Sequence, residues 1–278
     1  MNDFFRPPKG SNENAGTIML AVWLMFLSVF ILGYFVSVAF DSFLGDAAWQ
    51  SLTISFSSTL PVLLLALLVP VIYKRPVLTL ITAAARFRWK LFGVGAGIWA
   101  GLLIVGAAIG YAIDPTSFTL VFDASKFIPM LLVCLIMIPI QISAEELLYR
   151  GVLTQAFARA FGSDAVVIVL STTVFALPHL LNPEASGAPL LAFITYGAIS
   201  FGWVMAARTF GGLEITLGAH LVNNFFGILV VSYANAVVDT APIWMTPAPV
   251  LSITAISSVV TTALWLGILH VAQKRVVL

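Results

Sequence analysis

Long apolar stretches separated by short polar segments run along almost the whole chain. About 20 residues, rising 1.5 Å each along a helix, cross a hydrocarbon core about 30 Å thick, so stretches near that length predict transmembrane helices. The fold class that this pattern predicts is all-α, a polytopic transmembrane helical bundle. It has about eight spans, at residues 17–40, 51–73, 91–113, 127–156, 165–182, 188–206, 213–236 and 250–272.

The first and fourth stretches need separate interpretation. Residues 17–40 form a longer run than the apolar core of a signal peptide, about 7–15 residues, and so predict a retained span rather than a cleaved leader. The fourth stretch is too long for one span if its helix is continuous. Its second half, residues 144–162, is more amphipathic, and we expect this half to run toward the cytosol.

The basic residues indicate the orientation of the bundle. Cytoplasmic segments of membrane proteins carry an excess of Lys and Arg. With eight spans and both termini cytoplasmic, all 13 Lys and Arg residues except Lys126 fall on the cytoplasmic side. A count shifted by one span would destroy this asymmetry, so the sequence predicts both termini in the cytosol.

Composition supports a membrane protein, since 60% of the residues are hydrophobic and 9% are charged, against about 25% charged in soluble domains. The lipid bilayer is therefore a partner. The net charge of +1 and the lack of a basic patch predict no nucleic-acid partner. One cysteine, Cys134, excludes an internal disulfide and a CxxC metal site. We interpret the tryptophans within the spans as packing residues: Trp23, Trp99, Trp203 and Trp265.

Three polar clusters interrupt the apolar spans. An ionisable side chain at mid-bilayer costs at least ~2.5–3.5 kcal/mol, so such residues usually face a protein-lined cavity. At 1.5 Å per residue, the clusters lie about 12–22 Å from the predicted cytoplasmic ends of their helices. Three segments that reach one layer meet the requirement for a single site open to cytosolic water. The clusters are Glu145, Glu146 and Arg150 on the fourth span, His179 on the fifth, and His220 and Asn224 on the seventh.

Spacing along each helix suggests roles for these residues. Glu146 and Arg150 are four residues apart and share a helix face, which predicts an ion pair. Glu145 is turned about 100° away and is the candidate general base. His220 and Asn224 are also four residues apart and present an imidazole and an amide together. Each cluster alone has a structural explanation, as a solvated helix boundary, a packing histidine or an interhelical hydrogen bond. Their convergence favours a site that activates water.

In this order the clusters resemble the signature of the CPBP (CAAX protease and bacteriocin-processing, or Abi) family of intramembrane metalloproteases, which includes the type II CAAX prenyl endopeptidases. The family pattern is EExxxR, FxxxH and HxxxN. This sequence matches it without departure at Glu145-Glu146 with Arg150, Phe175 with His179, and His220 with Asn224. The resemblance divides the chain into an N-terminal region with three spans (1–125), a CPBP-like catalytic core (126–230), and a C-terminal helix and tail (231–278).

The resemblance implies a membrane-embedded endopeptidase. Its substrate would be a membrane-associated peptide or protein, including prenylated CAAX-type substrates, although a bacterial host would argue against prenylation. In a bacterium the protein would lie in the cell (inner) membrane. The oligomeric state is not indicated. Glu145 would activate water, His179 and His220 would position water or transfer protons, Asn224 would stabilise the oxyanion, and Glu146 and Arg150 would support the base.

Two mechanisms stay open at the level of sequence. Glu145, His179 and His220 could hold Zn²⁺ or another divalent metal as a His₂Glu site with an open water position. These ligands would come from three helices, without an HExxH pair. Alternatively, the glutamate and a histidine activate water with no metal. We take metal-free activation to be at least as good an interpretation.

Two other functions compete with catalysis. A non-catalytic membrane immunity or scaffold protein, as in bacteriocin self-immunity, would keep its protective effect after Glu145→Ala. A proton-coupled transporter also uses intramembrane Glu and His. Against a transporter, the chain shows no internal repeat, and its polar residues are confined to the fourth to seventh spans.

Overall fold

The computed structural model describes residues 4–6, 19–20, 23–24, 27, 31–44, 48–57 and 59–276. Within these residues, six helices are long and apolar enough to cross a membrane, and Glu214–Val230 is a shorter apolar helix. Much of the predicted first span, 17–40, lies outside the described residues. The protein is therefore an integral membrane protein and an all-α polytopic bundle, while the count of eight spans and the cytoplasmic termini stay predictions.

Helices form most of the described chain, and their bounds lie near those of the predicted spans. The seventh predicted span, 213–236, is the exception, because its helix ends at Val230 and is followed by a strand. The longer helices are α2 (Gly33–Leu44), α3 (Ala48–Ser57), α4 (Thr59–Tyr73), α5 (Trp89–Ile113), α6 (Ala124–Glu146), α7 (Thr154–Phe161), α8 (Asp164–Ala176), α9 (Pro189–Phe210), α10 (Glu214–Phe225) and α11 (Leu251–Val276). Short helical turns connect them: η2 (Val77–Leu80), η3 (Pro115–Ser117), η5 (Pro178–Leu181) and η6 (Pro183–Ala185). Two π-helical segments, η4 (Leu147–Leu153) and η7 (Phe226–Val230), continue α6 and α10.

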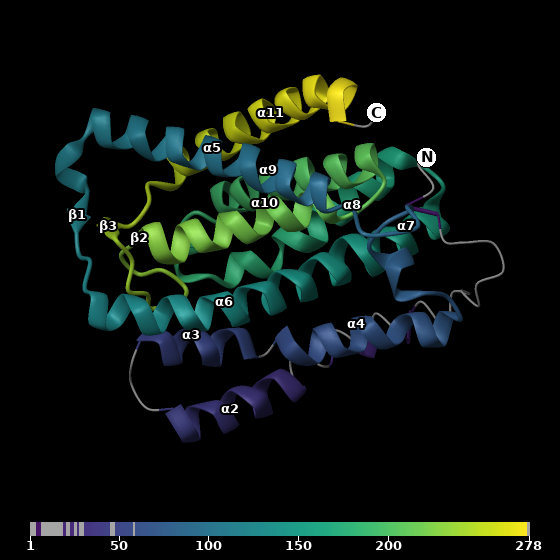
Figure 1. The fold of residues 1–278 in the computed structure, drawn as a ribbon, viewed down its shortest axis with the longest axis horizontal. Helices are drawn as coiled ribbons and strands as arrows, with labels where there is room; N and C mark the ends of the chain where they lie inside the picture. The colour runs from purple at the N-terminus through teal and green to yellow at the C-terminus, as the bar shows by residue number, and fades with distance from the viewer. Residues whose placement is uncertain are drawn as a thin grey trace.

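Helix α10 is enclosed by its neighbours. It packs against α5, α6 and α9, while α9 in turn lies between α8 and α11 (Figure 1). Helices α3 and α4 lie along α6, and α2 lies outside them. The outer faces of α5 and α11 expose large apolar side chains such as Ile104, Ile109, Ile256 and Val260, as contact with lipid requires. Polar side chains on α10 are thus held away from lipid.

Helices α6, η4 and α7 form one continuous helix of 38 residues, Ala124–Phe161. At 1.5 Å per residue this helix is about 57 Å long, nearly twice the ~30 Å hydrocarbon core. The fourth stretch, which the sequence showed to be too long for one span, contains no break. Its second half therefore extends past the hydrocarbon core as a continuation of the same helix. Asp123 caps its start by accepting hydrogen bonds from the hydroxyl and the backbone N–H of Ser125, which lower the pKa of this exposed carboxyl group.

Two glycines allow α5 and α10 to touch along their backbones. A Cβ atom on Gly218 would lie 2.1 Å from a backbone oxygen of α5, and one on Gly95 would lie 2.0 Å from a backbone oxygen of α10. Any side chain at either position would push the helices apart. This close crossing brings Trp99 of α5 beside Asn223 of α10, and the two side chains are joined by a hydrogen bond of 3.1 Å.

The two ends of the bundle differ. Three short strands, β1 (Thr119–Leu120), β3 (Trp244–Thr246) and β2 (Val231–Tyr233), pair in the order β1-β3-β2 at one end, antiparallel between β1 and β3 and parallel between β3 and β2. Helix α7 and the turn between α9 and α10 lie at the opposite end (Figure 1). In that turn Gly211 adopts a left-handed conformation (φ 67°), and α10 begins at Glu214, whose buried carboxylate pairs with Arg88 at 2.8 Å.

Candidate active site

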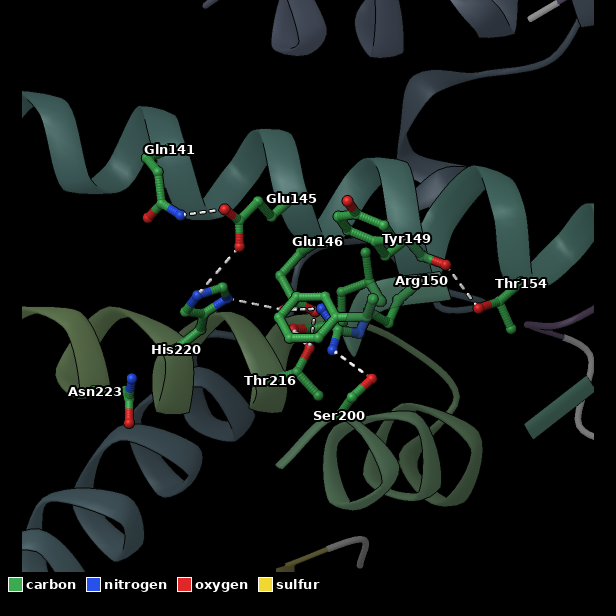
Figure 2. A network of polar contacts seen from close by, with 12 residues as sticks. Gln141, Glu145, Glu146, Tyr149, Arg150, Thr154, Ser200, Thr216, His220 and Asn223 are labelled. Atoms are coloured by element: carbon green, nitrogen blue, oxygen red, sulfur yellow. Dashed lines mark hydrogen bonds and ion pairs between the residues drawn. The ribbon is translucent and has the colours of Figure 1, made fainter. Parts of the chain in front are cut away.

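Glu146 is a fully buried carboxylate with three partners from two helices. Arg150 Nη1, one turn further along the same helix, donates to Oε1 at 3.1 Å. From α10, Thr216 Oγ1 donates to Oε2 at 2.8 Å, and His220 Nδ1 lies 3.0 Å from Oε1. The predicted ion pair between Glu146 and Arg150 is confirmed, and both side chains are 0% exposed. Figure 2 shows these groups facing one another between α6 and α10.

Arg150 is held by aromatic rings as well as by Glu146. Its guanidinium carbon lies 3.9 Å from the ring centre of Phe175 and 5.3 Å from that of Trp203, close enough for cation–π attraction. Its Nη2 donates to Ser200 Oγ at 3.1 Å. A buried charge is costly unless it is paired and hydrogen-bonded, and here the protein surrounds the cation on several sides. The arginine is therefore a rigid part of the site.

The helix widens at this point. Leu147–Leu153, immediately after the glutamate pair, is π-helical, a distortion that often accompanies functional sites. The Thr154 hydroxyl donates to the backbone oxygen of Tyr149, five residues earlier, at 2.7 Å, and bonds the Ser171 hydroxyl of α8 at 2.8 Å. The widened turn thus has its own polar support.

Glu145 has a different environment from Glu146. Its side chain is 24% exposed, whereas that of Glu146 is fully buried. Gln141 Nε2, one turn earlier on α6, donates to Oε1 at 2.5 Å. The other oxygen, Oε2, faces His220 Nε2 across 3.6 Å. As the helical angle predicted, Glu145 points away from the ion pair, and its second oxygen remains for chemistry.

The tautomer of His220 follows from its neighbours. An ionised carboxylate can only accept, so His220 Nδ1 carries the hydrogen that bonds Glu146. In the neutral ring Nε2 is then an acceptor, and it faces another acceptor, Glu145 Oε2. Two acceptors cannot hydrogen-bond to each other, so these two atoms, 3.6 Å apart, need a donor that they share. The imidazole ring also packs on Trp203, with ring centres 4.4 Å apart.

Asn224 reaches the site through an amide. Its Nδ2 donates to Gln141 Oε1 at 2.7 Å, and the same Gln141 bonds Glu145. Asn223 Nδ2 donates to Asn224 Oδ1 at 3.1 Å. One N–H of Asn224 is therefore occupied, and the other remains for a substrate oxygen.

His179 lies close enough to Glu145 and His220 to interact with them electrostatically, and its ring centre is 4.7 Å from that of Phe175. Its Nδ1 donates to the backbone oxygen of Phe175 at 2.8 Å, and its ring stacks on Tyr196 with centres 4.2 Å apart. Tyr196 in turn donates to Glu184 Oε1 at 2.5 Å and accepts from Asn182 Nδ2 at 3.0 Å. Among the described residues His179 has no direct bond to Glu145 or His220, and its Nε2 is left as a free acceptor. Helix α8 ends just before Pro178, as that proline predicts.

The three metal-ligand candidates do not form a ready metal centre. Glu145 Oε2 and His220 Nε2 face one another, but within the described part of the chain no three His, Cys, Asp or Glu side chains are grouped to hold one ion. A catalytic zinc site of the His₂Glu type needs three such ligands. The donor set of the described residues does not fit that group. The choice between the two mechanisms stays a prediction.

Sequence reasoning missed several residues of the site. Gln141 and Thr216 could have been found, because each lies four residues before a predicted site residue and shares its helix face. The others have no such local signal, and Trp203, interpreted as a packing residue, also contacts both the arginine and an imidazole. The missed residues are Gln141, Ser200, Trp203, Tyr196 and Thr216.

Comparisons with known proteins place the chain in a family. Residues 124–226, which carry all of these side chains, match a family model described as type II CAAX prenyl endopeptidase Rce1-like. The chain is 31% identical over 259 residues to the uncharacterized protein YyaK of Bacillus subtilis (strain 168), an alignment that covers 87% of this chain and 86% of that protein. No solved structure matches the chain.

Proposed function

This chain belongs to the Rce1-like family of type II CAAX prenyl endopeptidases, and from that membership we propose that it is an intramembrane endopeptidase. It hydrolyses peptide bonds of membrane-associated substrates with water activated by a glutamate and histidine. Its candidate groups lie inside a helical bundle whose outer faces are apolar. A substrate anchored in the bilayer reaches such a site by lateral diffusion.

The observation that carries this proposal is the pair of facing acceptors. Glu145 Oε2 and His220 Nε2 are 3.6 Å apart, and the other polar atom of each group is already occupied, by Gln141 and Glu146 respectively. A water molecule that donates one hydrogen to each acceptor satisfies both. Its lone pairs then point away from the two groups, toward a bound peptide carbonyl.

The reaction follows general-base catalysis. Glu145 takes a proton from the water as the oxygen attacks the scissile carbonyl carbon, and the carbonyl oxygen becomes an oxyanion. The second N–H of Asn224 stabilises this oxyanion. When the C–N bond breaks, the proton held by Glu145 passes to the leaving nitrogen. The acyl product is a carboxylic acid that keeps the other hydrogen of the water and loses it to solvent, and so leaves as a carboxylate. The other product is a new amine, and the base is restored.

The surrounding residues support this step without taking part in bond formation. Glu146, itself held by Arg150, orients His220 so that Nε2 points at the water. His179 presents a free Nε2 from the α8–η5 turn, where it contacts substrate or leaving group and assists proton transfer. Water activation proceeds without a metal, because one carboxylate and one imidazole suffice to hold and deprotonate the water.

We further propose a class of substrate and a membrane location for the protein. Substrates are peptides or proteins attached to the membrane. They include CAAX-type chains that carry an isoprenoid, since the description of the family names this class of substrate. The protein lies in the cell membrane, with the candidate groups facing the cytoplasmic half of the bilayer, as the distribution of Lys and Arg predicts.

The test uses purified full-length protein in lipid vesicles and a quenched fluorogenic peptide with a lipid anchor. Wild type is expected to cleave it, and Glu145→Gln to lose at least about a thousandfold in kcat, the scale of a lost general base. Asp123→Asn, an exposed carboxylate just before the same helix, is the matched control and keeps full activity. Equal cleavage by Glu145→Gln and wild type would contradict the proposal, and no cleavage with intact biological protection would favour a binding protein.

A further inference from the structure

Three buried tryptophans pack together beside the site, and one of them differs from the others. Trp99 lies 5.9 Å from Trp203 and 5.2 Å from Trp265 between ring centres. Only the indole N–H of Trp99 has a side-chain partner among the described residues, Asn223 Oδ1 at 3.1 Å. The N–H groups of Trp203 and Trp265 are buried without one. The packing interpretation therefore explains two of these indoles but not the third.

The bond from Trp99 is the first of four in a row. Asn223 Nδ2 donates to Asn224 Oδ1 at 3.1 Å, and Asn224 Nδ2 donates to Gln141 Oε1 at 2.7 Å. Gln141 Nε2 then donates to Glu145 Oε1 at 2.5 Å. The series begins on α5, passes through α10 and ends on α6. We refer to these five residues as the amide relay.

The direction of the amide relay is set by its two ends. An indole N–H can only donate, and an ionised carboxylate can only accept. Each amide between them must accept on the Trp99 side and donate on the Glu145 side, so only one orientation of the three amides satisfies all four bonds. A flip of any one amide would place two donors or two acceptors against each other. Successive bonds in such a chain also polarise and strengthen one another.

We propose that Trp99 and Asn223 are positioning residues of the hydrolytic reaction, acting through this relay. The inference rests on the proposed function. By fixing the orientation of Asn224 and Gln141, the relay aims the second N–H of Asn224 at the substrate oxygen and presents an N–H to Glu145. Neither Trp99 nor Asn223 belongs to the three family motifs, and Trp99 lies outside the residues that the family model matches, 124–226.

The backbone contact between α5 and α10 gives the relay its rigidity. Gly95 lies one turn before Trp99 on α5, and a Cβ at Gly95 or Gly218 would collide with the opposite backbone. The indole and Asn223 are thus held at a fixed separation by this close crossing of the two helices. The region before the matched domain thereby contributes to the candidate site through α5.

The first experiment compares Trp99→Phe with Trp265→Phe in the vesicle assay. Both changes remove an indole from the same buried cluster, but only Trp99→Phe removes a hydrogen bond of the relay. We expect Trp99→Phe to lower kcat about tenfold, the factor for one buried hydrogen bond of about 1.4 kcal/mol, with KM nearly unchanged. Trp265→Phe keeps kcat within about twofold, a packing change that leaves every relay bond in place. Equal kcat for the two variants would overturn the inference.

A second measurement observes the hydrogen bond of Trp99 directly, and it needs neither catalysis nor a large change of side chain. Indole N–H signals of protein labelled at tryptophan report hydrogen bonding directly, and the Trp99 signal is expected downfield of those of Trp203 and Trp265. Asn223→Asp keeps the acceptor for Trp99 but cannot donate to Asn224. It is therefore expected to keep the Trp99 signal in place while lowering kcat as Trp99→Phe does. A Trp99 signal like those of the unbonded indoles would overturn the relay.

A double-mutant cycle separates a shared relay from two independent structural effects. Trp99→Phe and Gln141→Leu interrupt the same series, so their effects on kcat are expected to be far less than multiplicative. Trp265→Phe combined with Gln141→Leu is expected to be multiplicative. If wild type cleaves the peptide but the first pair is also multiplicative, the relay fails while the proposed function stands. If wild type cleaves nothing, the proposed function fails, and the positioning role fails with it.

Discussion

Two imidazoles face the site, one from each of two sides. Each side holds its histidine by different contacts. On the α10 side, defined by Glu146, Thr216 and His220, both ring nitrogens of the buried histidine are directed at carboxylates on α6. On the α8–α9 side, defined by His179, Tyr196 and Glu184, the ring bonds its own turn through Nδ1 and stacks on a tyrosine. The first histidine is positioned by polar contacts with carboxylates of another helix, and the second by a local hydrogen bond and by ring contacts with Phe175 and Tyr196.

This difference separates a histidine that is fixed in place, His220, from one that is presented to a substrate, His179. Because His220 joins α6 to α10 through a buried carboxylate, moving its ring would disturb the packing of two helices. His179 lies in a short helical turn with a free Nε2 and can adjust to a substrate at small cost. Rigid groups suit the holding of water, and an adjustable one suits contact with substrate.

Glu146→Ala attacks the α10 side directly. Arg150 would remain fully buried without its counterion, and losing one member of a buried pair costs about 3–5 kcal/mol. We expect the variant to unfold at much lower temperature or denaturant than wild type, as followed by circular dichroism in detergent. Glu145→Ala is the control, since that side chain is partly exposed and the ion pair of Arg150 is made with Glu146 instead. Wild-type stability in Glu146→Ala would show that the buried pair is not needed.

His220→Ala and His179→Ala test the two sides against each other. His220→Ala is expected to lower kcat about 10²- to 10³-fold, and also stability by about 1–3 kcal/mol, because Glu146 loses a donor. His179→Ala is expected to lower kcat about 100-fold with little change in stability, since only a turn and a ring contact are lost. Activity and unfolding measured on the same samples decide the matter. An equal loss of stability in both variants would contradict the distinction between the two sides.

Tyr196→Phe tests the α8–α9 side alone. The change keeps the ring that stacks on His179 and removes the hydroxyl that donates to Glu184. Losing that anchor is expected to lower kcat about threefold, less than the loss of one hydrogen bond, because the stack remains. Thr195→Val is the matched control on the same helix, since the Thr195 hydroxyl bonds only the backbone oxygen of Leu191. No difference between the two variants would mean that the hydroxyl does not position the ring.

Chelation is expected to have the smallest effect. If Glu145 and His220 activate water without a metal, dialysis against EDTA or 1,10-phenanthroline leaves kcat unchanged. A zinc peptidase treated alongside should lose its activity and so validate the chelator. Loss of activity that Zn²⁺ restores would instead support the metal-dependent alternative and would require His179 to approach the other two ligands.

Much of the fold followed from local pattern. Apolar runs near 20 residues located six of the long helices, because length and hydropathy act along the chain. The long fourth stretch was harder. Sequence showed that it exceeded one span but not that it would stay a single rod, since continuity depends on what packs along it.

From the residues alone we could predict the helical spacing that pairs Glu146 with Arg150 and turns Glu145 away, and the common depth of the polar residues. Spacing within one helix is set by its 3.6-residue turn and needs no other part of the chain. Which of these groups meet depends on how the helices pack against one another. Thr216 reaches Glu146 across 70 residues of sequence and Trp99 reaches Asn223 across 124, contacts without any local signature. They exist because α10 lies between α5 and α6, and helix packing determines which distant residues become neighbours.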